Sequence, residues 1–190
     1  MKRLLFCAVV VAICGLITGP ASASKGGGSG NLKCFTGAPA TCTVSSSGST
    51  VTLDTHSGGY AGAYLTNTRN AGAALTSVDY TFNYNCDPVD DSASCVGGGS
   101  PRWSIPIDTN GDSKTDGYAF LDAAGCGSDG VVSTTEADCG VNFQGADYAS
   151  WDSFAAAHPT YTIANALPFV ITDTTEPGTT LISAISVTRA

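Results

Sequence analysis

The sequence predicts an all-β fold, a disulfide-stapled antiparallel β-sandwich with one short helix near residues 148–158. Three observations predict this fold. Apolar and polar residues alternate with a period of two in several segments, as in strands that bury one face. Gly, Pro, Asn and Asp interrupt these segments at intervals of roughly 8–12 residues, which is typical of sandwiches and barrels. An even number of cysteines follows the N-terminal leader, which favours disulfides in an exported protein.

The leader, residues 1–23, has the pattern of a signal peptide. Lys2 and Arg3 give it a positive start, residues 4–18 form a continuous apolar run, and the small residues 21–23 fit a cleavage site. The apolar run is shorter than the about 20 residues that span a membrane. We therefore predict a secreted, extracellular protein without a membrane span after cleavage, with the periplasm or the cell surface as other destinations.

Two segments follow the leader. Residues 24–33 are rich in Gly and Ser, which predicts a flexible lead-in. Residues 34–190 form one β-sandwich domain, because no repeat or boundary divides them. Without Lys2 and Arg3, six basic residues remain against 16 acidic ones, which gives a net charge of −10. This charge disfavours nucleic acid and anionic lipid as partners.

The clearest predicted strand alternates over residues 76–85, with Thr76, Val78, Tyr80, Phe82 and Tyr84 on one face. A second strand repeats the pattern, with Trp103, Ile105 and Ile107 on one face. Further strands are predicted at residues 49–55, 59–66, 117–122, 130–134, 140–144, 160–164, 167–172 and 180–188.

The helix near residues 148–158 is indicated by apolar residues at every third position, Tyr148, Trp151, Phe154 and Ala157. Asp147 or Ser150 can cap its start. Pro159 ends it, because the residue before a proline avoids helical geometry. We predict that Trp151 and Phe154 close one end of the sandwich and do not line a ligand site.

Six cysteines remain after the leader. Pairing between nearest neighbours closes short, turn-rich loops, so we predict the disulfides Cys34–Cys42, Cys86–Cys95 and Cys126–Cys139. Each would contribute about 2–3 kcal/mol through chain entropy. A metal–thiolate cluster is the alternative, but the chain has no CxxC pair and the compartment is oxidising.

The strongest chemical signal is the acidic loop of residues 108–117, between two predicted strands. Oxygen-bearing side chains stand at its first, third, fifth and ninth positions, and Lys114 at the seventh offers its backbone carbonyl. A hard cation such as Ca²⁺ takes about six to eight oxygen ligands, and this spacing wraps oxygens round one point. The alternative is an ordinary solvated turn.

The loop resembles the DxNxDGxxD calcium loops of thrombospondin type 3 repeats, FG-GAP repeats and dockerins. The resemblance implies a Ca²⁺ site whose ligands are Asp108, Asn110, Asp112, Asp116 and the carbonyl of Lys114. Two residues depart from these patterns. Ser113 stands where those families usually carry Gly, and Ala119 stands where an EF-hand carries Glu, which excludes a full EF-hand.

A second acidic cluster, Asp87, Asp90 and Asp91, lies inside the predicted Cys86–Cys95 loop. The cluster can complete the same cation site or make another one. The alternative is a solvated loop tip.

No catalytic set is recognisable in the sequence. His56 lies in a turn without the context of a catalytic triad, and His158 ends the predicted helix. Both glutamates fall in predicted loops, while Asp79 and Asp122 lie on predicted strands without a visible partner, so the paired carboxyl groups of a glycosidase are not indicated. We therefore predict that the protein is not an enzyme.

A secreted, disulfide-stapled sandwich with a calcium loop is similar to the jelly-roll carbohydrate-binding modules of secreted bacterial proteins, which often carry a structural calcium. Residues 180–189 resemble the terminal strand of such modules, which returns into the sheet. The resemblance implies sugar binding through aromatic side chains on an exposed sheet face. The candidates are Tyr60, Tyr64, Tyr84, Trp103 and Tyr118, each of which can instead be a core residue.

The sequence thus predicts a secreted, non-catalytic, calcium-stabilised binding module for a polysaccharide or cell-envelope glycan. A structural or adhesin-like extracellular protein without a small ligand is the first alternative. An unrecognised secreted hydrolase is the second. The sequence indicates no oligomeric state.

Overall fold

The computed structural model describes residues 32–55, 58–66, 68, 70–86, 100–127, 130–173 and 178–189. The predicted signal peptide, the second acidic cluster, Cys95 and His56 lie outside these residues. Within the described part of the chain, no helix has the length and apolar character needed to cross a membrane.

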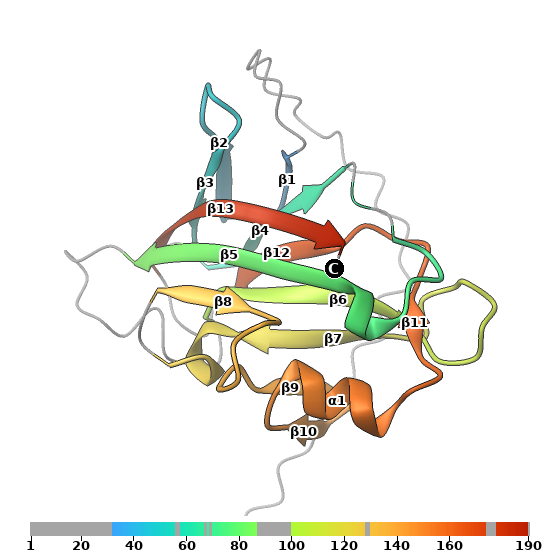
Figure 1. Cartoon of the computed structure of the whole chain (residues 1–190). Coiled ribbons are helices and arrows are strands. Elements are labelled where there is room, and N and C mark those ends of the chain that lie inside the picture. Colours follow the sequence, from blue (N-terminus) through green and yellow to red (C-terminus); the bar gives the residue numbers. More distant parts are fainter. Residues whose placement is uncertain are drawn as a thin grey trace, which may run out of the picture.

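The chain folds into two antiparallel sheets packed face to face, which confirms the predicted β-sandwich (Figure 1). Sheet A has eight strands in the order β1-β4-β12-β6-β7-β9-β10, with β11 paired to β6. Its strands are β1 (Leu32–Gly37), β4 (Tyr60–Leu65), β6 (Arg102–Asp108), β7 (Gly117–Asp122), β9 (Val141–Phe143), β10 (Ala146–Tyr148), β11 (Thr162–Ile163) and β12 (Phe169–Asp173). Sheet B has five strands in the order β2-β3-β13-β5-β8, which are β2 (Thr41–Val44), β3 (Thr50–Asp54), β5 (Val78–Cys86), β8 (Val131–Ser133) and β13 (Thr179–Arg189).

Each strand predicted from periodicity coincides closely with an observed one, but β1, β2 and β10 were not predicted. These strands are short, and β1 and β2 lie in a segment that resembles a turn-rich loop. Pairing with neighbours makes them strands, since β1 runs along β4 with Leu32 opposite Leu65. The strand β1 therefore includes Leu32 and Lys33, the last two residues of the predicted lead-in.

The C-terminal strand β13 returns into the middle of sheet B, between β3 and β5. Its pairing register with β5 shifts between Ser183 and Ser186, and Ala184 has a positive φ of 48°. A bulge of this kind bends a strand and increases its twist. In sheet A, β12 takes the corresponding central place between β4 and β6.

The core lies between the sheets and corrects one predicted binding residue. Trp103 is fully buried, with its ring centroid 5.5 Å from that of Tyr80 and 5.8 Å from that of Phe82. The predicted sugar-binding role of Trp103 is therefore wrong, because β6 turns this side chain inward with Ile105 and Ile107. Burying such a side chain contributes about 1.5–3 kcal/mol.

The predicted helix is α1 (Trp151–Ala157), and Tyr148 belongs to β10 instead. Ser150 caps its start in a reciprocal pair with Ser153, as one of the two predicted caps. Trp151 and Phe154 are buried, and the Trp151 indole N–H donates to the carbonyl of Leu75 at 2.9 Å. The prediction that these aromatic residues pack into the core is confirmed.

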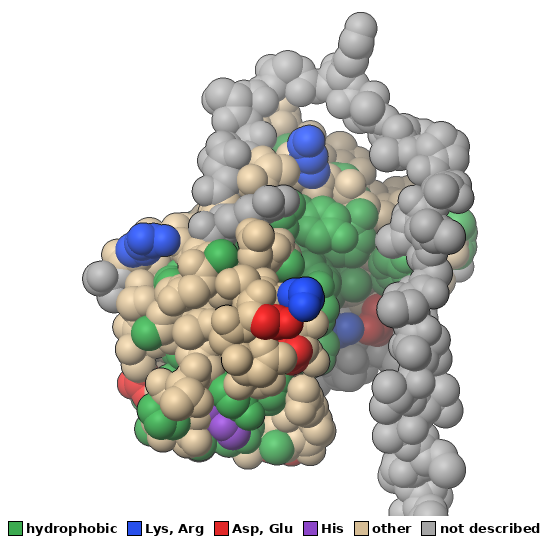
Figure 2. Space-filling model, turned by 90° about the vertical axis from the view of Figure 1, so that its right-hand side faces the viewer, with side chains coloured by type: hydrophobic (Ala, Val, Ile, Leu, Met, Phe, Trp, Pro, Cys, Tyr) green, Lys and Arg blue, Asp and Glu red, His purple; other side chains and the backbone are tan. Residues whose placement is uncertain are grey.

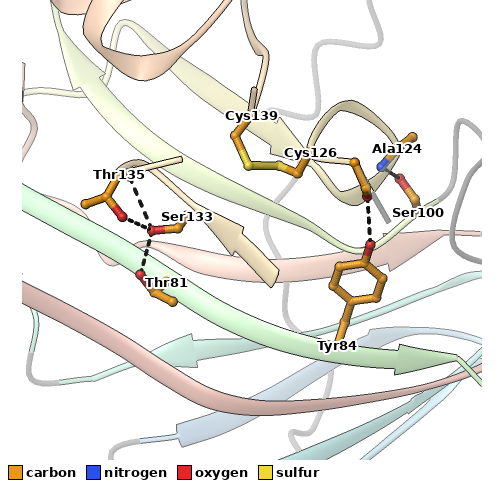
Figure 3. The surroundings of a disulfide bond; sticks show 9 residues. Thr81, Tyr84, Ser100, Ala124, Cys126, Ser133, Thr135 and Cys139 are labelled. Atoms are coloured by element: carbon orange, nitrogen blue, oxygen red, sulfur yellow. Dashed lines mark hydrogen bonds between the residues drawn. A yellow bond between two sulfur atoms is a disulfide. The ribbon is translucent and has the colours of Figure 1, made fainter. Parts of the chain in front are cut away.

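Two of the three predicted disulfides lie within the described residues and are confirmed. Cys34–Cys42 joins β1 of sheet A to β2 of sheet B. Cys126–Cys139 joins the residue after the 3₁₀ turn η4 (Ala123–Gly125) to the segment before β9 (Figure 3). Cys86 is disulfide-bonded, but its predicted partner Cys95 lies outside the described residues.

Candidate functional site

The outward face of sheet A carries a group of aromatic side chains, which we call the aromatic face. In antiparallel sheets, directly opposed residues point to the same side. Phe169 lies opposite Tyr64 on β4 and opposite Ser104 on β6, and Ser104 lies opposite Phe120 on β7. Alternation along each strand adds the remaining members, so the aromatic face comprises Phe35, Tyr60, Tyr64, Tyr118, Phe120 and Phe169.

Five of the six rings of the aromatic face, all except Phe120, are connected by ring contacts. Phe169 is the central ring, with centroid distances of 5.4 Å to Phe35, 5.5 Å to Tyr64 and 5.4 Å to Tyr118, all in edge-on geometry. The ring centroid of Phe35 also lies 4.5 Å from that of Tyr64. Edge-on and tilted pairs are the favourable arrangements for aromatic rings. In Figure 2, hydrophobic side chains gather toward the right of the view, beside basic and acidic ones.

Of the five candidate sugar-binding residues, Tyr60, Tyr64 and Tyr118 meet on this face. Tyr60 is 39% exposed, while Tyr64 and Tyr118 are half-buried. Burial raises the pKa of Tyr64, and the neighbouring hydroxyls of Tyr118 and Tyr60 raise it further. Tyr84, the further tyrosine considered from the sequence, is on β5 of sheet B, and its hydroxyl donates to the carbonyl of Gly127 (Figure 3).

Two glycines make room for the rings. A Cβ atom at Gly62 would collide with the ring of Phe35 and would lie 2.5 Å from the carbonyl oxygen of Val170. A Cβ atom at Gly37 would collide with the ring of Tyr60. Each of the strands β1 and β4 thus places an aromatic ring over a glycine of the other strand, Phe35 over Gly62 and Tyr60 over Gly37. The missing side chains let the rings approach the backbone closely.

A group of charged side chains, which we call the polar trio, lies on the same outward face. It consists of Arg102, Asp122 and Asp173 from β6, β7 and β12. Arg102 is directly opposite Asp122, and its Nη2 lies 2.9 Å from Oδ2 of Asp173. Its guanidinium carbon also lies 5.7 Å from the ring centroid of Phe120, a cation–π distance. Burial raises the pKa of Asp122, with nearby Asp173 also raising it and Arg102 and Ser100 lowering it.

Neighbouring Ser104 adds a buried polar atom between the aromatic residues. Its side chain is fully buried, and its hydroxyl has no hydrogen-bond partner among the described residues. Phe169 and Phe120 lie opposite it on the two adjacent strands. Most buried hydroxyls have a partner, so this one is unusual.

The acidic loop connects β6 and β7 and leaves the sandwich at the right of Figure 1. Asp108 is 1% exposed, and its carboxylate accepts hydrogen bonds from the backbone N–H groups of Asn110, Gly111 and Ser113 at 2.7–3.0 Å. Burial alone would raise the pKa of Asp108, but these backbone donors together lower it. The carboxylate of Asp108 therefore acts as the fixed centre of the loop.

The other predicted calcium ligands are held by the loop itself. Asn110 Oδ1 accepts from the N–H of Asp112, and Asp116 accepts from the N–H and hydroxyl of Thr109. Lys114 forms an ion pair with Asp112 at 2.8 Å, and this hydrogen bond lowers the pKa of Asp112. Within the described residues, no group of three or more His, Cys, Asp or Glu side chains is arranged to hold a metal ion.

Candidate catalytic groups are spread apart. Asp79 points outward from sheet B and Asp122 points outward from sheet A, so they face opposite sides of the sandwich. His158 follows α1, as predicted, where its ring stacks on Tyr161 at 4.3 Å and its Nε2 lies 2.7 Å from the Tyr148 hydroxyl. These contacts place His158 in the aromatic packing at one end of the sandwich.

No protein-family model matches the chain, and neither the curated proteins nor the solved structures give a match.

The sequence analysis missed Phe35, Phe120, Phe169, Arg102 and Asp173. It considered Asp122 only as a carboxyl group without a visible partner. The available signal was the alternation of aromatic residues with small apolar ones, as in β4 and β7. Such strands have two apolar faces, and only the register of the folded sheet decides which face is turned outward.

Proposed function

We propose that the protein is a secreted, non-catalytic binding module and that its aromatic face binds a polysaccharide. The observation that carries this proposal is the outward group of contacting rings on sheet A. A sandwich normally turns polar residues to the solvent on its outer faces. Aromatic side chains there offer apolar surface to the C–H faces of sugar rings, and tyrosine adds a hydroxyl for hydrogen bonds.

The extent of the aromatic face favours a chain of sugars over a single sugar. Its rings come from β1, β4, β12 and β7, with β6 between the last two. Strands lie about 4.8 Å apart, so four steps across the sheet span roughly 19 Å. The two disulfides and the signal-peptide pattern of the leader support export, which would bring the protein into contact with extracellular polysaccharides.

The experiment is affinity electrophoresis in gels that contain hydroxyethylcellulose, arabinoxylan, galactomannan or soluble starch. We expect at least one polymer to retard the wild-type protein. Tyr60→Ala should weaken that retardation at least fivefold, whereas Leu181→Ala should not change it.

These two variants are matched, because Tyr60 and Leu181 are 39% and 41% exposed and lie on the outward faces of different sheets. If no polymer retards the wild type, or if both variants behave alike, polysaccharide binding by the aromatic face is refuted. A structural or adhesin-like protein is then the better account.

We further propose that Ca²⁺ stabilises the acidic loop through Asp108, Asn110, Asp112, Asp116 and the carbonyl of Lys114. The donors are the hard oxygens that Ca²⁺ prefers, and they lie in one short loop. Calcium must compete with the ion pair between Lys114 and Asp112. Lys114→Ala removes this competition and should strengthen calcium binding.

Differential scanning calorimetry tests the calcium proposal. A ligand that binds only the folded state must raise the melting temperature. Millimolar Ca²⁺ should therefore raise the melting temperature above its value in EDTA, and more so in Lys114→Ala. Equal melting temperatures in EDTA and Ca²⁺ for both proteins would refute the site.

A further inference from the structure

The polar trio continues the aromatic face, so the two form one surface. Arg102 on β6 is opposite Asp122 on β7 and opposite Ile171 on β12. Asp173 follows two residues after Ile171 and is opposite Tyr60 of the aromatic face. By strand alternation, these charged side chains point to the same side as the aromatic rings.

Contacts hold the polar trio in place. Arg102 is bound to Asp173 at 2.9 Å and lies against the ring of Phe120, and its side chain is only 18% exposed. A guanidinium fixed by a carboxylate and a ring presents its remaining donors in a defined direction. Asp122 lies directly across from it, partly buried, and receives a hydrogen bond from Ser100.

The polar trio holds more negative than positive charge. The ion pair between Arg102 and Asp173 balances one carboxylate, which leaves the charge of Asp122 as the excess. Its burial is unfavourable for folding, since desolvation opposes the ionised form. A group kept at the expense of stability on an outward face is typical of a functional site.

Resting on the proposed polysaccharide binding, we propose that the polar trio is the hydrogen-bonding subsite of the aromatic face and makes it selective for neutral glycans. Asp122 accepts hydrogen bonds from sugar hydroxyls, and Arg102 donates to sugar oxygens. A glycan that carries carboxylates is repelled by Asp122 and by the overall charge, which is −10 without the leader.

The test takes each neutral polymer named above that retards the wild type and pairs it with the carboxymethylated derivative of the same polymer, for example hydroxyethylcellulose with carboxymethylcellulose. The proteins are the wild type, Asp122→Asn and the control Asp79→Asn, which changes an aspartate on the outward face of sheet B. Retardation in affinity gels gives the dissociation constants, and calorimetry gives the melting temperatures.

We expect the carboxymethylated polymer to retard the wild type at least tenfold more weakly than its neutral counterpart does. Asp122→Asn should weaken binding to the neutral polymer at least fivefold, without a lower melting temperature. The same variant should also reduce the ratio between the dissociation constants for the acidic and the neutral polymer. Asp79→Asn should change none of these values.

Two results would overturn the subsite. One is undiminished binding by Asp122→Asn, and the other is equal wild-type binding to the neutral and acidic polymers. Both differ from a failure of the proposed function, in which no neutral polymer retards the wild type or Tyr60→Ala binds normally. A lower melting temperature of Asp122→Asn together with weaker binding would instead assign Asp122 a structural role.

Discussion

The two outward faces of the sandwich are built from different residues. The aromatic face of sheet A holds six contacting or neighbouring aromatic side chains. The outward face of sheet B, which we call the threonine face, opposes Thr43 to Thr52, and Ser183 to Asn83. Both sheets bury the same kind of apolar residues on their inward faces. The apolar residues on the inward faces are explained by the need for a hydrophobic core. The aromatic residues on the outward face of sheet A are not explained by that need.

The difference extends to cross-strand pairs. On the threonine face, polar side chains form hydrogen bonds with one another, as between the hydroxyls of Thr81 and Ser133 at 2.8 Å. On the aromatic face, rings lie over glycines, and the hydroxyl of Ser104 has no partner among the described residues. The threonine face is thus an ordinary polar sheet surface, whereas the aromatic face is an outward apolar one.

The largest expected effect on stability comes from Gly62→Ala, which attacks the packing of the aromatic face. The new Cβ would collide with the Phe35 ring and lie 2.5 Å from the Val170 carbonyl oxygen. Because this oxygen belongs to the backbone of β12, moving it would disturb the strand. We expect a loss of about 2–4 kcal/mol in the free energy of unfolding, measured in urea. The control is Gly125→Ala, whose Cβ would lie 3.8 Å from its nearest neighbour. Equal stability of the two variants would contradict this packing.

The next effect comes from the disulfide that joins the edges of the two sheets. Replacing Cys34 and Cys42 together by Ser should reduce the free energy of unfolding by about 2–3 kcal/mol. Hydrogen exchange should also become faster in β1, which among the described residues pairs with β4 alone, and remain unchanged in β5. Uniform acceleration across both sheets would show that this disulfide does not act locally on the aromatic side of the sandwich.

A pH series compares one carboxyl group from each outward face. The folded-state pKa of Asp122 is raised, so the folded protein holds this proton more tightly than the unfolded chain. Stability is therefore lost as the pH rises from about 4, the unfolded pKa of Asp, through the folded pKa. Asp122→Asn should unfold at a higher temperature than the wild type at pH 7, and the difference should vanish below pH 4. If Asp79→Asn gives the same pH profile, the effect is not specific to the aromatic face.

The smallest effect concerns the acidic loop, which connects β6 to β7. Ser113 has a φ of 65°, in the left-handed region that favours glycine. Ser113→Gly should stabilise the protein by about 0.5–1 kcal/mol, with Ser113→Ala as the control that keeps the strain. Polysaccharide retardation should be the same in both variants. A loss of retardation would show that the acidic loop contributes to binding.

Much of the fold could be predicted because its signals are local. The alternation around Tyr80 and the capping residue Ser150 are properties of neighbouring residues, and both were confirmed. The strand β1 could not be predicted in the same way, because its strand conformation depends on pairing with β4 across the sheet. Trp103 shows a related difficulty, since an aromatic residue on an alternating strand fits either face until the register is known.

The candidate site was predicted only in part for the same reason. Tyr60, Tyr64 and Tyr118 were identified as aromatic residues on strands. Their proximity depends on β12, a strand far away in sequence, whose Phe169 contacts both Tyr64 and Tyr118. Arg102, Asp122 and Asp173 come from three strands and become neighbours only through the register of β6 with β7 and β12. Predictions about single residues were therefore better than predictions about groups of residues.

The most direct test of glycan binding by the aromatic face is a map of amide chemical shifts in the wild-type protein during titration with a neutral hexasaccharide made from the polymer that retards it. We expect the largest shift changes on β4, β12, β6 and β7, around Tyr64, Phe169 and Asp122, and no changes at the outward residues of β3 and β13. Changes centred on the threonine face or on the acidic loop, or no changes at all, would contradict glycan binding by the aromatic face.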